Sequence, residues 1–74
     1  MEVNIKTLEE YLKEVFLLLN DAHKVEELVT LKTLGMGAIL FCLKTHIISY
    51  NELTELTEKL NEVYETRLSE IRLK

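Results

Sequence analysis

Residues 34–43 read Leu-Gly-Met-Gly-Ala-Ile-Leu-Phe-Cys-Leu, and this stretch decides the fold because no charged side chain interrupts it. Together with Thr33 it fills the eleven positions between Lys32 and Lys44. A membrane-spanning helix needs about 20 apolar residues, so we expect a helix that is buried inside a protein or at an interface. The rest of the chain must then provide what covers it.

Composition indicates one folded helical domain over residues 1–74. Hydrophobic residues make up 47% of the chain and charged residues 30%, with no proline and two glycines, which is not typical of a linker or a disordered segment. The nine basic residues are scattered and the net charge is −4, which argues against direct binding of nucleic acid. A chain of 74 residues buries only a small core, so a partner chain would add stability.

The cysteine content and the N-terminal sequence predict a cytoplasmic protein without a membrane span. Cys42, the only cysteine, cannot form an internal disulfide and fits a buried thiol in a reducing compartment. Residues 1–6 lack the basic start and the apolar core of a signal peptide. Whether these residues are ordered, and whether Val3 and Ile5 fold over the end of the molecule, stays open.

Capping patterns predict where the first two helices begin. Thr7 and Glu10 have the spacing of a capping box, so we predict a first helix over residues 7–20. Its apolar residues recur at steps of three and one and form a single stripe: Leu8, Tyr11, Leu12, Val15, Phe16 and Leu19. Asn20 and Asp21 are turn and N-cap residues, so we expect the central helix over residues 22–45.

A second capping box, formed by Ser49 and Glu52, predicts the last helix over residues 50–72, with Ile48 and Leu53 at the hydrophobic-staple positions. Its expected inner face consists of Leu53, Leu56, Leu60, Val63, Tyr64, Leu68 and Ile71. Short connections place consecutive helices antiparallel. The predicted fold is therefore all-α, a three-helix antiparallel bundle with a short first helix and two long helices.

The expected helix lengths predict a homodimer. A first helix of about 14 residues cannot cover a central helix of about 24 at 1.5 Å per residue, which leaves residues 38–43 open on one side. Soluble monomers rarely leave such a large apolar patch exposed. We therefore expect a two-fold homodimer that forms a six-helix assembly. The predicted dimer or partner interface consists of Gly35, Met36, Gly37, Ile39, Leu40, Phe41 and Leu43.

The two glycines in the central helix require an explanation. Each of Gly35 and Gly37 destabilises a helix interior by about 1 kcal/mol relative to alanine. One interpretation is a kink or a break between two helices. The other is that the missing side chains let a second copy of the same helix come close, and the sequence leaves both open.

The last helix carries an acidic face. Residues 49–66 contain five glutamates and one lysine, a local charge of −4. The five glutamates, most of them on one side of the helix, are Glu52, Glu55, Glu58, Glu62 and Glu65. A solvated helix exterior is the simpler interpretation. The alternative is a surface that meets a basic protein or imitates nucleic-acid phosphates.

No catalytic, metal or cofactor motif is predicted, and we expect a protein that is not an enzyme. Cys42 and His46 are one helical turn apart, and a dimer could bring two such pairs together as zinc ligands. A buried thiol and a helix-end histidine explain the two residues more simply. The Gly35–Gly37 segment is not a phosphate loop, because no strand precedes it and no nucleotide motif follows.

These patterns predict a function in protein binding. The main hypothesis is a non-enzymatic helical interaction module, an adaptor or regulator that acts as a homodimer and docks on a larger protein by its helix faces. The alternative is an acidic nucleic-acid mimic that inhibits a nucleic-acid-binding protein through the Glu-rich face of the last helix. The sequence does not name the partner in either case.

Overall fold

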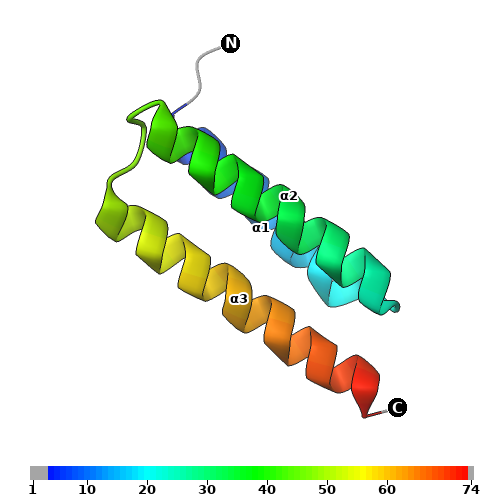
Figure 1. Cartoon of the computed structure of the whole chain (residues 1–74). Coiled ribbons are helices and arrows are strands. Elements are labelled where there is room, and N and C mark those ends of the chain that lie inside the picture. The colour runs from blue at the N-terminus through cyan, green and yellow to red at the C-terminus, as the bar shows by residue number, and fades with distance from the viewer. Residues whose placement is uncertain (1–3, 74) are drawn as a thin grey trace.

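Three helices form the fold in the computed structural model, which describes residues 4–73. They are α1 (Ile5–Asp21), α2 (Val25–Lys44) and α3 (Tyr50–Arg72), and no strand occurs within residues 4–73. Figure 1 shows the helices side by side, each running opposite to the one before it. Each helix contacts the other two. The prediction of an all-α chain with three helices is confirmed.

Helix α1 begins earlier than the capping pattern predicted. Its N-cap is Asn4, whose side-chain oxygen accepts a hydrogen bond from the Thr7 backbone N–H at 3.0 Å. Thr7 therefore lies inside the first turn, and the predicted capping box of Thr7 and Glu10 is wrong. Asparagine and threonine are both good N-cap residues, and here the earlier one takes the position. The predicted role of Val3 lies outside the described residues, whereas Ile5 is the first residue of α1.

The first connection also differs from the expected one. Helix α1 continues through Asn20 and Asp21, and the chain turns at residues 22–24 instead. The N-cap of α2 is Lys24, which makes no side-chain capping bond. Ala22, the C-cap residue of α1, is buried at 2% exposure, so the turn packs against the core and the predicted polar cap is absent.

The predicted capping box at the start of α3 is confirmed. The Glu52 backbone N–H donates to the Ser49 hydroxyl at 3.2 Å, and the Ser49 N–H donates to the Glu52 carboxylate at 2.9 Å. Ile48 is buried and Leu53 is half-buried, as their staple positions require. Helix α3 spans Tyr50–Arg72, the range predicted for the last helix.

The core lies along the line where the three helices meet. Its fully buried side chains come from every helix: Leu12, Leu19, Leu28, Ile39 and Leu60. Leu8 near the start of α1 and Cys42 near the end of α2 are both buried at 3% exposure. The core therefore extends almost to the C-terminal end of α2.

This arrangement corrects the premise from which the dimer was predicted. Helix α1 has 17 residues and α2 has 20, so their lengths are about 26 and 30 Å at 1.5 Å per residue. The expected difference of ten residues between the lengths of the two helices is wrong. Helix α1 starts earlier than predicted, and α2 begins later and ends earlier than predicted. Of the stretch from Ala38 to Leu43, Ile39 and Cys42 are buried within the chain itself. The case for a second copy must therefore rest on the residues that stay exposed.

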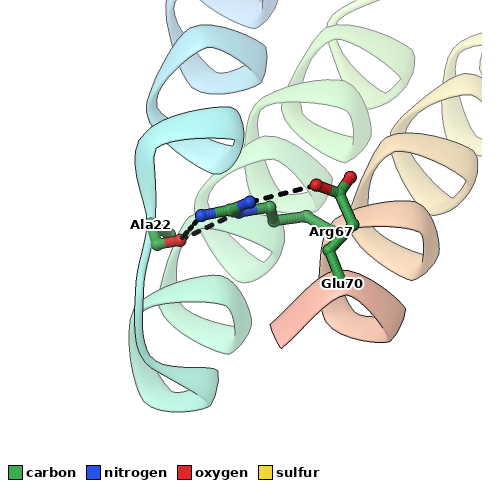
Figure 2. A network of polar contacts seen from close by, with 3 residues as sticks. All are labelled: Ala22, Arg67 and Glu70. Carbon is green, nitrogen blue, oxygen red and sulfur yellow. Dashed lines mark hydrogen bonds and ion pairs between the residues drawn. The ribbon is translucent and has the colours of Figure 1, made fainter. Parts of the chain in front are cut away.

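A polar contact fastens α3 to the connection between α1 and α2 (Figure 2). Arg67 donates from Nε and Nη2 to the Ala22 carbonyl oxygen at 2.9 and 2.8 Å, across 45 positions of sequence. Its Nη1 forms an ion pair with Glu70 at 3.1 Å. The Arg67 side chain is only 13% exposed. A cation at this place also opposes the partial negative charge at the end of α1.

Candidate interaction surface

Helix α2 presents polar and small residues on the side that faces away from the core. Its buried side consists of Leu28, Gly35, Ile39 and Cys42. The opposite side, here called the outer ridge, is exposed along its whole length and consists of Glu26, Thr30, Thr33, Gly37 and Lys44. The spacing of three, four and seven residues places these five on one line along the helix.

Two apolar pairs border the outer ridge, and we call them the flanks. Val29 and Leu40 form one flank, with 47% and 46% of their surface exposed. Leu34 and Phe41 form the other, with 50% and 54% exposed. From Val29 to Phe41 the chain carries a single charged residue, Lys32.

Neighbouring contacts show which helix each flank borders. The Lys32 ammonium lies 4.4 Å from the ring centroid of Tyr64 in α3, and Val29 is one helical turn from Lys32. The first flank is therefore on the α3 side. Leu31 lines a groove together with Leu18 of α1, and Leu34 is one turn from Leu31. The second flank is therefore on the α1 side.

Gly35 has a role inside the chain. A Cβ at Gly35 would lie 2.9 Å from Cδ2 of Leu60 and 3.2 Å from its Cδ1. The absence of a side chain therefore lets α3 pack closely on α2, and the predicted contact of Gly35 with a second copy is corrected. Ile39 is fully buried in the same core, so it too is withdrawn from the predicted interface.

The other predicted interface residues remain near or at the surface. Met36 and Leu43 are half-buried against the core, while Leu40 and Phe41 belong to the flanks. Gly37 is exposed, and a Cβ there would meet nothing within 4 Å. Helix α2 runs without a break through both glycines, which excludes the interpretation as two helices.

The acidic face divides into one capping residue and four solvent-facing ones. Glu52 is half-buried and accepts the Ser49 N–H in the capping box. The other four are exposed: Glu55, Glu58, Glu62 and Glu65. Within residues 4–73 the ion pair is that of Arg67 with Glu70, so these four make none there. Their charges therefore face solvent.

Cys42 is a core residue. Burial raises the pKa of its thiol above the ordinary value, because the interior disfavours the charged thiolate. His46 lies in the exposed turn after α2 with φ of 62°, a left-handed conformation. Among the described residues, no three His, Cys, Asp or Glu side chains are grouped so that they could hold a metal ion.

A groove between α1 and α2 was not predicted from the sequence. It is an open depression with a volume of about 430 Å³, lined by Leu18, Asp21, Glu26, Glu27, Thr30 and Leu31. Three carboxylates and no basic side chain border its apolar floor. Asp21 comes from α1 and the two glutamates from α2, so only the tertiary packing brings these acids together.

No known protein family, curated protein sequence or solved structure matches this chain. Within residues 4–73, no helix is both long and apolar enough to span a membrane.

Proposed function

We propose that the chain is a non-enzymatic helical interaction module, an adaptor or regulator that forms a homodimer and docks on a larger protein. The observation that supports this is the pair of flanks on α2. Four large apolar side chains, each about half exposed, lie beside the outer ridge of a single helix. Several large apolar side chains exposed on one face of a helix are typical of a binding surface.

The flanks favour a protein partner over a small ligand. They border a convex helix, whereas small-molecule sites are concave and enclose most of the ligand. Removing the remaining exposed half of a leucine or phenylalanine side chain from water contributes about 1 kcal/mol. Several such contributions are needed to offset the entropy of association, which a second protein surface supplies and a small molecule does not.

Phe41→Glu tests the homodimer. We expect the wild-type chain to sediment at micromolar concentration with a mass of about 17 kDa, twice 8.7 kDa. Phe41→Glu should be a folded monomer, because position 41 is half exposed and a carboxylate there stays solvated until a partner covers it. Tyr50→Glu is the matched control, since Tyr50 is 77% exposed at the start of α3, away from the flanks.

Helical content measured by circular dichroism should be the same for the wild type and both variants. If the wild type sedimented as an 8.7 kDa monomer at hundreds of micromolar, the homodimer would be contradicted. A Phe41→Glu chain that dimerises as well as the Tyr50→Glu control would also contradict it.

A second candidate function is inhibition of a nucleic-acid-binding protein by an acidic surface. The four exposed glutamates of α3, none of them in an ion pair within residues 4–73, favour it. The two functions differ in salt dependence. Screening weakens charge recognition steeply between 50 and 500 mM salt, whereas apolar docking changes little.

The experiment for the larger partner uses one triple variant, with Glu55, Glu58 and Glu62 each changed to Gln. If the apolar surface binds the partner, a partner captured on the wild-type chain in a pull-down should also bind the triple variant. It should stay bound to the wild-type chain at high salt. Loss of the partner in both conditions would instead support the acidic mimic. The triple variant should fold like the wild type, because exposed charges contribute only a few tenths of a kcal/mol each.

A further inference from the structure

The charged ends of the outer ridge of α2 are complementary to those of a second copy of the ridge that runs antiparallel to it. Glu26 is nine positions before Gly35 and Lys44 is nine positions after it, on the same line along the helix. We infer that α2 packs antiparallel against α2 of a second copy, about a two-fold axis that passes beside position 35. This inference rests on the proposed homodimer and specifies its geometry.

The axis places opposite charges together at both ends of the contact. Glu26 of each copy lies opposite Lys44 of the other, and the two pairs are equivalent by symmetry. A parallel arrangement would instead place Glu26 against Glu26 and Lys44 against Lys44. Neither side chain has an ion pair within residues 4–73, so both are available. Charge complementarity therefore selects the antiparallel arrangement.

The flanks match in the same arrangement. A two-fold axis in the plane of the contact keeps the α3 side of one copy beside the α3 side of the other. Val29 is six positions before Gly35 and Leu40 is five after it. Val29 of one copy and Leu40 of the other therefore lie within about 1.5 Å of each other, measured along the helix axis. On the α1 side, the two Leu34 residues meet near the axis, about 3 Å apart along the helix.

The middle of the ridge allows a close approach of two helices. Thr33 is two positions before Gly35 and Gly37 is two after it, so each threonine faces a glycine of the other copy. A Cβ at Gly37 would meet nothing within 4 Å of its own chain. Small residues at a helix crossing let the backbones come near each other.

The hydroxyl groups of Thr30 and Thr33 can be buried in the dimer contact at little cost. The Thr30 hydroxyl donates to the Glu26 carbonyl at 2.9 Å, and the Thr33 hydroxyl donates to the Val29 carbonyl at 2.8 Å. Each hydroxyl proton is thus satisfied within α2 before any partner arrives. Burying a polar group that already has its hydrogen bond costs little, whereas burying an unsatisfied one is strongly unfavourable.

The acidic groove beside the ridge is placed for the lysine of the second copy. Glu26 lines this groove together with Asp21 and Glu27, so Lys44 of the other chain arrives among three carboxylates. A stable interface buries about 800 Å² on each partner. That is roughly a seventh of the 5384 Å² surface of this chain, and one side of a three-helix molecule provides it.

Charge reversal tests the arrangement on the purified full chain. Glu26→Lys and Lys44→Glu should each raise the dimer dissociation constant about threefold to tenfold, measured by sedimentation equilibrium at low salt. The double variant restores both pairs with the signs exchanged, so its dissociation constant should return to within about twofold of the wild type. Glu55→Lys, on α3, is the control for Glu26→Lys, because it changes the net charge equally and should not weaken the dimer.

Gly37→Arg provides an independent test of the crossing point. The side chain enters open space in the single chain, so circular dichroism should show unchanged helical content while sedimentation shows a monomer. A wild-type dimer whose dissociation constant is unaffected by Gly37→Arg, or is not restored in the double charge variant, would overturn the antiparallel geometry and leave the homodimer intact. A monomeric wild type would overturn both.

Discussion

Leu60→Ala is expected to lower the free energy of unfolding by about 2–5 kcal/mol. Leu60 is fully buried in the middle of α3 and fills the space that Gly35 leaves on α2. Truncation removes the apolar contacts and opens a cavity between the two helices. A domain of 74 residues is stable by roughly 4–11 kcal/mol, so the variant should unfold at a much lower urea concentration.

A second substitution makes this prediction specific to the contact with Gly35. In the Leu60→Ala background the two leucine methyl groups that crowd position 35 are gone, so Gly35→Ala should recover about 1 kcal/mol through its better helix propensity. In the wild-type background Gly35→Ala should not raise the free energy of unfolding, because its Cβ would press on Leu60, which is fully buried. The double-mutant cycle isolates the coupling.

Leu73→Ala is the control for the lost leucine, since Leu73 is 86% exposed. It should change the free energy of unfolding by less than about 0.5 kcal/mol. Equal effects of Gly35→Ala in the two backgrounds would contradict the packing of α3 into the glycine position.

Local patterns predicted the start of α3 and missed the starts of α1 and α2. The Ser49 and Glu52 signal holds because both partners and both staple residues coincide at a single position. At α1 two cap residues, Asn4 and Thr7, lie three positions apart, and only Thr7 is followed three positions later by a glutamate, Glu10. The buried stripe that begins at Leu8 is compatible with either start, so hydrophobic periodicity could not decide between them.

The candidate surface was predicted in position but not in detail. Apolar residues of α2 lie on most sides of the helix, so the sequence alone could not show which of them face α1 and α3. Packing buries Gly35 and Ile39 and leaves Leu40 and Phe41 exposed, although all four lie within seven residues. The distinction depends on where the neighbouring helices cross α2, and that depends on contacts distant in sequence, such as Leu60 against Gly35.

Arg67 shows the same limit of local patterns. The position lies among charged residues at the end of α3, and nothing nearby in sequence indicates that its guanidinium reaches the backbone of Ala22. The contact exists only once the connection between α1 and α2 is folded. It could be predicted only from the tertiary structure.

Arg67→Met should therefore lower the free energy of unfolding by about 1.5–3 kcal/mol, the usual contribution of hydrogen bonds from a charged group. Methionine keeps an apolar stem and removes the donors, so the Ala22 carbonyl loses two hydrogen bonds in a part-buried place. Glu70→Gln is the matched control, because it removes the ion pair alone. Glu70 is 55% exposed, and the loss there should be only a few tenths of a kcal/mol. Urea unfolding of the three chains separates the two contributions. If Arg67→Met were no less stable than Glu70→Gln, the contact between α3 and the α1–α2 connection would contribute nothing to folding.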